Sequence, residues 1–248
     1  MKPKVAFFDF ACCEGCQLQI VDLEEQLLDL LNIVDLVEFR EAISDKGPEY
    51  DISFIEGSIT REQDEARIKD IRNRSKILVA FGACATTGGV NKLKNLWSSL
   101  DDVRKEVYKE DWKQEHLDTY PTKAVDEVVK VDYYIHGCPI NKDEFLSIVK
   151  SLAIGKEPKL PVYPVCVECK MKENVCLFDK GQVCLGPIAL AGCGAMCPSN
   201  GSACEACRGT MPNPNKNAMH EVLKENGLTV DDIKEKFTIF AVKPEVSK

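Results

Sequence analysis

Short apolar runs alternate with helical patterns over the first 155 residues of the chain. The apolar runs occupy residues 5–10, 33–39, 51–55, 76–81 and 131–135. Apolar residues recur every three or four positions between residues 17 and 31, and a more polar helical stretch covers residues 61–74. Runs of this length are typical of buried strands, and the longer spacing is typical of helices with one apolar face. The pattern therefore predicts an α/β domain.

The last helix of this region has a clear start. Asn141 stands at a capping position, Glu144 follows three residues later, and four apolar residues then recur at helical spacing. They are Phe145, Ile148, Val149 and Leu152. Residues 90–125 are polar and show no period, so we expect irregular structure there. Strands that alternate with helices form a parallel sheet covered on both faces, which predicts a flavodoxin-like domain over residues 1–155.

Residues 156–210 have a different composition, because cysteine, glycine and proline replace most of the apolar residues. Eight of the thirteen cysteines fall here: Cys166, Cys169, Cys176, Cys184, Cys193, Cys197, Cys204 and Cys207. So few apolar side chains cannot order the segment by hydrophobic burial. Eight thiolates are enough for two four-cysteine metal sites, and metal binding supplies folding free energy directly. We therefore predict a small, irregular cysteine-rich domain over residues 156–210 and a helical tail over residues 211–248.

Disulfides, zinc and iron–sulfur clusters compete as the chemistry of these cysteines. Disulfides need an oxidising compartment, and residues 1–4 lead into the first strand without a signal-peptide pattern. Zinc uses the same Cys-x-x-Cys pairs and remains open on spacing. The spacing of Cys193 and Cys197, with Pro198 directly after, resembles the Cys-x-x-x-Cys-Pro ending of ferredoxin motifs. The spacing therefore favours iron–sulfur clusters over zinc.

The remaining cysteines lie just after predicted strands. They are Cys12, Cys13 and Cys16 after the first strand, Cys84 after the fourth and Cys138 after the fifth. The carboxyl ends of parallel strands meet at one edge of a sheet, where open α/β proteins bind ligands. Cys13, Cys16, Cys84 and Cys138 are enough for a third metal site. The alternative is a set of unrelated buried thiols, because free cysteine packs as a small hydrophobe.

Three other features belong to the same predicted edge. Glu56 follows the third strand, where it would relay protons or accept backbone amides. His136 follows the fifth strand, where it would tune a cluster through a hydrogen bond or simply be satisfied locally. The glycine-rich residues 82–89 are not a phosphate-binding loop, because no Lys-Ser/Thr pair follows at the required offset.

Composition and charge exclude several classes of protein. The chain has 248 residues and a net charge of −8, without a long basic run, which argues against a nucleic-acid partner. No apolar stretch approaches the roughly 18 residues of a membrane span. With three histidines and thirteen cysteines, metal binding would use thiolates. An acidic chain rich in reduced thiols, with no signal pattern, is expected in the cytoplasm.

Several of these motifs together resemble the small, electron-transferring subunit of nickel–iron hydrogenases. They are Cys-Glu-Gly-Cys at residues 13–16, Glu-Gly at 56–57, Gly-Ala-Cys-Ala at 82–85 with Gly-Gly at 88–89, and Gly-Cys-Pro at 137–139. The second array is similar to the cytoplasmic branch of that family, which contains sulfhydrogenases and NAD(P)-linked enzymes. Its motifs are Cys-Leu-Gly-Pro at 184–187, Cys-Pro at 197–198 and Cys-x-x-Cys-Arg-Gly at 204–209. The match covers about residues 4–210.

The resemblance implies three 4Fe–4S clusters. A proximal cluster would be held by Cys13, Cys16, Cys84 and Cys138. By family order, the distal ligands would be Cys166, Cys169, Cys176 and Cys184, and the medial ligands Cys193, Cys197, Cys204 and Cys207. Many relatives have histidine first in the distal set, and others have proline at the second medial position. Cys166 and Cys197 stand at those positions here, which implies that all three clusters are 4Fe–4S.

The tandem pair of Cys12 and Cys13 departs from the hydrogenase pattern. It resembles the related cluster subunit of respiratory complex I, in which adjacent cysteines both ligate. Cys16 supplies the hydrogenase spacing here. Cys13 and Cys16 are therefore assigned as ligands, and Cys12 as a buried neighbour.

The resemblance implies electron conduction between a nickel–iron centre in a large partner subunit and an acceptor module. That module would contain iron–sulfur or flavin diaphorase-type subunits and would serve NAD(P), ferredoxin or a sulfur species. The hydrogenase reaction itself would take place in the partner, so no catalytic residue is assigned in this chain. Two alternatives are a complex I-like quinone-reductase cluster subunit and a zinc-stapled interaction scaffold without a redox role.

Overall fold

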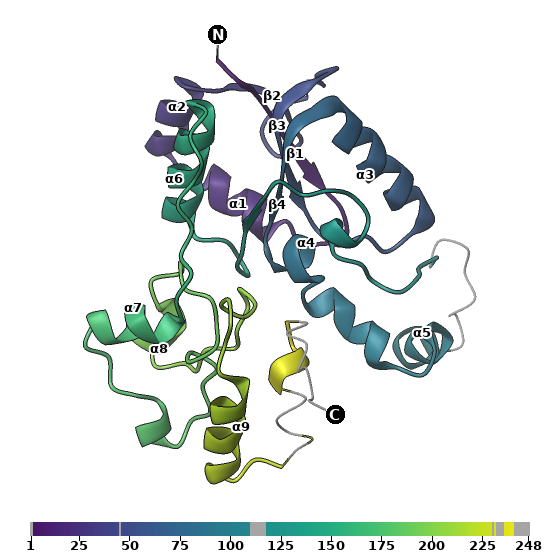
Figure 1. The fold of residues 1–248 in the computed structure, drawn as a ribbon. Coiled ribbons are helices and arrows are strands. Elements are labelled where there is room, and N and C mark those ends of the chain that lie inside the picture. Colours follow the sequence, from purple (N-terminus) through teal and green to yellow (C-terminus); the bar gives the residue numbers. More distant parts are fainter. Residues whose placement is uncertain (1, 45, 110–117, 230, 232–235, 241–248) are drawn as a thin grey trace. The chain divides into compact units, whose positions relative to one another are not determined.

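The structure is a computed structural model that describes residues 2–44, 46–109, 118–229, 231 and 236–240 (Figure 1). The chain divides into two compact units, residues 1–157 and residues 158–248. Each unit has its own buried core.

A five-stranded parallel sheet forms the centre of the first unit. Its strands are β1 (Lys4–Asp9), β2 (Asp35–Phe39), β3 (Tyr50–Glu56), β4 (Ser75–Phe81) and β5 (Tyr133–Ile135). Their order in the sheet is β2-β1-β3-β4-β5, and every neighbouring pair is parallel. Each strand coincides with one of the apolar runs. The three inner strands β1, β3 and β4 are mostly buried, and a strand buried on both faces has no need of polar alternation. The predicted α/β class with a flavodoxin-like sheet is confirmed.

Helices cover both faces of this sheet (Figure 1). The first unit contains α1 (Gly15–Val21), α2 (Glu25–Leu31), α3 (Glu62–Arg74), α4 (Ala83–Thr87), α5 (Leu100–Tyr108) and α6 (Lys142–Ala153). It also contains the 3-10 helices η1 (Val90–Leu96) and η4 (Val125–Glu127). Asn141 caps α6 as predicted, since its side chain accepts a hydrogen bond from the Glu144 backbone N–H at 2.9 Å.

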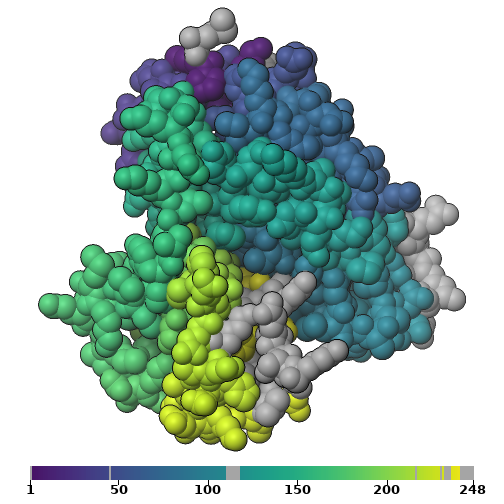
Figure 2. Space-filling view, viewed as in Figure 1, coloured from purple at the N-terminus to yellow at the C-terminus, as the bar shows by residue number. Residues whose placement is uncertain are grey.

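Alternate residues of the strands supply two separate cores. Phe54 of β3 packs with Phe7 and Phe145 on the face covered by α6. Its neighbour Ile55 joins Ile68 of α3 on the opposite face, because successive side chains of a strand point to opposite sides. The segment that contains η4 also packs on this second face, and Figure 2 shows it in teal at the surface.

Two segments differ from the sequence-based expectation. The helix expected over residues 17–31 is broken into α1 and α2, because Glu24 has a backbone φ of 51° and Leu23 turns into the core. The region expected to be irregular contains the helix α5, which begins directly after Ser99. The Ser99 side chain caps this helix by accepting a hydrogen bond from the Asp102 backbone N–H at 3.1 Å. A serine with an aspartate three residues later is a capping signal that the sequence already contained.

The second unit is short of regular structure. It contains α7 (Val165–Met171), α8 (Met196–Ser199), α9 (Lys216–Glu225) and the 3-10 helix η5 (Phe178–Lys180). Its small core includes Val165, Leu185 and Ile188 together with Leu223 of α9. In the described part of the chain, no helix is long and apolar enough to cross a membrane.

Replacing Phe145 by alanine tests the core beneath α6. The ring is fully buried against Phe7 and Phe54, so Phe145→Ala should lower the free energy of unfolding of the first unit by about 3–5 kcal/mol. Urea unfolding followed by far-ultraviolet circular dichroism measures this change. Lys150→Ala, at an exposed position of the same helix, should leave the midpoint nearly unchanged. Equal midpoints for the two variants would contradict the packing described here.

Candidate metal centres

The cysteines that follow the strands of the first unit lie near one another. Cys16 lies in the first turn of α1, and a Cβ atom added to Gly82 would meet the Cys16 Sγ at 2.5 Å. Gly82, which ends β4 with a φ of 85°, therefore has to be glycine for the two loops to approach. Burial, together with the nearby thiolates of Cys138 and Cys13, raises the pKa of Cys84 to about 12. Cys13, Cys16, Cys84 and Cys138, which come from three loops, thus lie near one another, and their role as ligands of one cluster stays a prediction.

Cys16, Cys84 and Cys138 have raised pKa values and are poor acids in the protein alone. Burial raises the pKa of Cys16 and of Cys138, and the Glu56 carboxylate adds to both effects. A thiolate is the form that binds a metal, and a bound cation offsets the cost of its charge. The chemistry of this group is therefore suited to a positively charged inorganic centre and not to free thiolates.

Glu56 fixes the loop that carries Cys16. Its carboxylate is 2% exposed and accepts hydrogen bonds from the backbone N–H groups of Cys16 and Gln17, each at 3.0 Å. Burial raises the pKa of Glu56, while the same two amides lower it. Of the two roles considered for Glu56, acceptance of backbone amides is what the structure shows.

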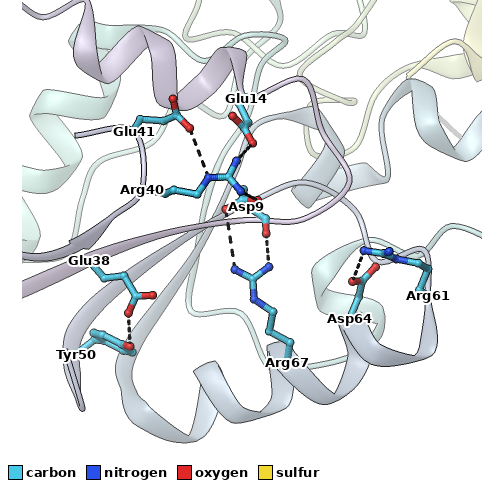
Figure 3. A network of polar contacts seen from close by, with 9 residues as sticks. All are labelled: Asp9, Glu14, Glu38, Arg40, Glu41, Tyr50, Arg61, Asp64 and Arg67. Carbon is cyan, nitrogen blue, oxygen red and sulfur yellow. Dashed lines mark hydrogen bonds and ion pairs between the residues drawn. The ribbon is translucent and has the colours of Figure 1, made fainter. Parts of the chain in front are cut away.

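Arg40 supports the same loop from outside the sheet. Its guanidinium pairs with Glu14, which lies between Cys13 and Cys16, and with Asp9 at the end of β1 at 3.2 Å (Figure 3). Glu14 has a backbone φ of 61°, which an L-residue adopts only where its surroundings hold it. This ion-pair network was not predicted from the sequence, because its members come from separate segments.

Cys12 and His136 lie at the same edge. Burial raises the pKa of Cys12 to about 12, and the charges of Glu56 and Cys84 contribute, so Cys12 lies close to the four-cysteine group. The His136 ring stacks on Tyr134 with centroids 5.8 Å apart and planes 4° apart.

In the second unit, four cysteines line one cavity of about 80 Å3. Cys166 and Cys169 lie on α7, and Cys176 and Cys184 lie in the loops that follow it. Leu177, Phe178, Pro187 and Pro198 form most of the remaining wall. The pKa of Cys166 is raised to about 11. Burial is the largest cause, and the neighbouring thiolates of Cys184, Cys169 and Cys176 contribute in that order. A water molecule occupies about 30 Å3 of liquid, so the cavity has room for more than one small ion.

The other four cysteines form a neighbouring group. Burial raises the pKa of Cys204, and the thiolates of Cys184, Cys207 and Cys193 raise it further. Burial also raises the pKa of Cys197, with contributions from Cys193 and Cys184. Cys184 is therefore close to both groups, and it lines the same cavity as Cys166.

Glu168 connects the two groups of the second unit. It stands between Cys166 and Cys169 on α7, and its carboxylate accepts hydrogen bonds from the backbone N–H groups of Gly192 at 2.8 Å and Ala195 at 3.0 Å. Those two residues flank Cys193. This role of Glu168 was not predicted from the sequence, although an acid inside a Cys-x-x-Cys motif is a visible signal.

Asn174 makes a second connection close by. Its Nδ2 donates to Ser199 Oγ at 2.9 Å, at the end of α8, and lies 3.7 Å from Cys169 Sγ. Amide donors directed at ligand sulfur are one means by which proteins adjust cluster potentials.

Within the described residues, no group of three or more histidine, cysteine, aspartate or glutamate side chains is arranged to hold a metal ion. A single Zn²⁺ needs its thiolates about 2.3 Å from one point. An iron–sulfur cluster instead places several irons and sulfides between its thiolates. A cysteine-lined cavity with largely apolar walls fits a cluster better than it fits one bare ion.

The chain is similar to a known protein family and to several known proteins. The family described as NADH ubiquinone oxidoreductase, 20 kDa subunit, matches residues 13–152. The sulfhydrogenase 2 subunit delta of Pyrococcus furiosus is 37% identical over 240 residues, 96% of this chain and 99% of that protein. A vhu subunit of the F420-non-reducing hydrogenase of Methanocaldococcus jannaschii is 36% identical over 237 residues, 83% of this chain and 81% of that protein.

A solved structure extends the likeness to the fold. A chain of an NAD+-reducing [NiFe]-hydrogenase in the H2-reduced state superposes with a TM-score of 0.59 at 27% sequence identity. The superposition covers 65% of this chain and 96% of the other.

Removing the Glu168 carboxylate tests its structural role. Glu168→Ala leaves the Gly192 and Ala195 amides without their acceptor, at a cost of about 1.5–3 kcal/mol for each charge-assisted hydrogen bond. We expect the purified variant to lose roughly one cluster, about four irons, from the second unit. Iron analysis and electron paramagnetic resonance measure the loss. Glu173→Ala, at an exposed position just after α7, is the matched control, and equal iron in both variants would refute the role.

Proposed function

The chain belongs to the family of the NADH ubiquinone oxidoreductase 20 kDa subunit, and within it we propose that this protein is the electron-transfer small subunit of a nickel–iron hydrogenase. The relatives that match most of the chain are named as hydrogenase subunits. The observation that carries the proposal is the cavity lined by Cys166, Cys169, Cys176 and Cys184, whose room and largely apolar wall suit an iron–sulfur cluster better than one zinc ion. A quinone-reductase role is less well supported, because the family alone points to it.

Three 4Fe–4S clusters are proposed, each with four cysteines. Cys13, Cys16, Cys84 and Cys138 would hold the proximal cluster in a domain of residues 1–155. In residues 156–210, Cys166, Cys169, Cys176 and Cys184 would hold the distal cluster, and Cys193, Cys197, Cys204 and Cys207 the medial one. Residues 211–248 would be a helical tail. The thiolates that affect Cys84 and Cys166 belong to the same proposed sets as these two residues, which supports the proximal and distal sets. Cys204 is close to Cys207 and Cys193 of its own set and also to Cys184.

When bound, iron–sulfur clusters accept and donate single electrons. The residues of this chain determine where that exchange takes place and at what potential. The thiolates bind, Glu56 and Glu168 hold the ligand loops, and the apolar wall around Leu177 and Phe178 excludes water from the distal set. Burial and hydrogen bonds near sulfur adjust cluster potentials, so Asn174 beside Cys169 is positioned to affect the distal cluster.

The proposed partners follow from the role. A large subunit with the nickel–iron centre would cover the proximal edge, and iron–sulfur or flavin diaphorase-type subunits would carry electrons to NAD(P), ferredoxin or a sulfur species. The relatives include a sulfhydrogenase subunit and a chain of an NAD+-reducing enzyme, which supports an acceptor of this range. Cluster ligation needs cysteines that are not consumed in disulfides, so we propose a reducing compartment such as the cytoplasm.

Metal analysis of the native complex tests the proposal. Twelve ligand cysteines predict about twelve irons on this chain, with nickel on a co-purifying larger subunit and no stoichiometric zinc. Zinc in place of iron, or a complex without nickel, would refute the hydrogenase assignment.

A pair of variants tests which of the two adjacent cysteines is a ligand. Cys12→Ala should retain all the iron, whereas Cys13→Ala should lose or convert the proximal cluster. A proximal signal that survives Cys13→Ala but not Cys12→Ala would exchange the roles of these two cysteines.

Cys197→Pro tests the medial ligand set. It removes one thiolate of four and leaves three cysteines that can hold a three-iron cluster, so an oxidised-state signal of that type should appear. The medial potential should rise and slow electron delivery to a low-potential acceptor, while hydrogen isotope exchange at the partner's nickel site continues. If Cys176→Pro produces the three-iron signal and Cys197→Pro does not, the medial assignment is wrong.

A further inference from the structure

A second concave site lies at the carboxyl edge of the sheet, and none of the thirteen cysteines lines it. It has a volume of about 450 Å3 and is lined by residues after β1, including Phe10, by Thr60 and Arg61 after β3, and by one side of α5. From β1 the chain proceeds to β2 on one side of the sheet, while β3 lies on the other. The crevice outside β1 and β3 is therefore a topological switch point, where open α/β sheets bind ligands. The volume is within the range of small-molecule sites, about 300–1,000 Å3.

The cationic side chains on the α3 side of the cavity already have partners of their own. Arg67 donates to the Asp9 backbone carbonyl at 2.7 Å and lies over the Phe10 ring, while Arg61 pairs with Asp64 at 3.4 Å (Figure 3). These cations have carboxylate or carbonyl partners of their own. This side of the cavity therefore contributes shape and little free charge.

On the opposite wall, two cationic side chains donate hydrogen bonds to the same residue, Thr119. Lys94 Nζ donates to the Thr119 Oγ1 at 2.5 Å, and Arg104 donates to the Thr119 carbonyl at 2.9 Å. Arg104 also pairs with the exposed Asp101 at 2.6 Å. Lys94 forms no ion pair with any residue that the structure describes. Burial lowers the pKa of Lys94, and the charge of Arg104 lowers it further. Asp118 also lines the cavity, but its carboxylate forms no ion pair with either of these two cations.

The remaining wall is apolar. Leu100, Val103 and Val107 follow one another at helical spacing along α5 and line the cavity together with Tyr108. Val107 is 62% exposed, so part of its side chain is open to a ligand in the cavity. A ligand that suits both walls has a negative group at one end and an apolar body at the other.

We propose that this cavity binds a small organic anion, with its phosphate or carboxylate group between Lys94 and Arg104 and its apolar body against α5. The anion supplies the partner that Lys94 lacks and reduces the repulsion between the two cations. The apolar body buries the exposed face of Val107. The site is independent of the iron–sulfur ligands and of the hydrogenase role.

Phenyl phosphate and benzoate are suitable probes, because each joins an anion to one aromatic ring. The full chain, purified with the subunits that accompany it, is titrated with both by isothermal titration calorimetry. At least one should bind saturably at one site, and which one binds better distinguishes a phosphate ester from a carboxylic acid as the natural ligand. Inorganic phosphate should bind more weakly than phenyl phosphate, and phenol should not saturate. The absence of saturable binding by both anions overturns the proposal.

Three variants locate the binding. Lys94→Gln should weaken the probe by at least about tenfold, the loss expected for one charge-assisted hydrogen bond. Lys105→Gln, on α5 but outside the cavity, is the matched control and should bind as the unaltered chain does. Val107→Ser, at an exposed position, should weaken phenyl phosphate several-fold and leave inorganic phosphate unchanged. Equal affinities of Lys94→Gln and Lys105→Gln would show that the anion binds elsewhere and would refute the site.

Discussion

The crowding of buried thiols is the physical constraint on which the rest of this structure depends. Cys84 and Cys166 both have pKa values raised by burial and by neighbouring thiolates, and each belongs to a group assembled from separate segments. Such groups are unfavourable as free thiolates and become favourable when a cation holds them. The two units satisfy this constraint on very different backbones, one a parallel sheet and the other a loop-rich fold.

A buried or half-buried carboxylate performs the same task in both units. Glu56 accepts two consecutive backbone amides beside Cys16, and Glu168 accepts two amides that flank Cys193. In each case an acid from another element fixes the backbone of a ligand loop. Loops rich in glycine lose much conformational freedom on ordering, so such fixed points reduce the number of conformations that compete with binding. A negative charge beside each ligand set also favours the oxidised, more positive state of a bound cluster.

The carboxyl edge of the sheet serves two neighbouring sites without merging them. The cysteine loops after β1, β4 and β5 form one group, while the crevice outside β1 and β3 opens toward α5 and is lined by cations. Asp9 and Arg40 lie at the boundary, where their ion pairs connect the end of β1 with the loop of Glu14. Parallel strands make this possible, because all their carboxyl ends face the same way.

The sequence by itself determined the sheet, the position of the cysteines after its strands and the cap at Asn141. These features depend on local patterns: apolar runs, helical spacing and a side chain that reaches its own helix. The break at Glu24 and the roles of Glu56 and Glu168 were decided only in the folded chain. The same holds for the proximity of Cys184 to both cysteine groups of the second unit and for the meeting of Lys94 with Arg104 at Thr119. Each of these is a contact between residues distant in sequence or a backbone conformation imposed by packing, and no local pattern encodes such a contact.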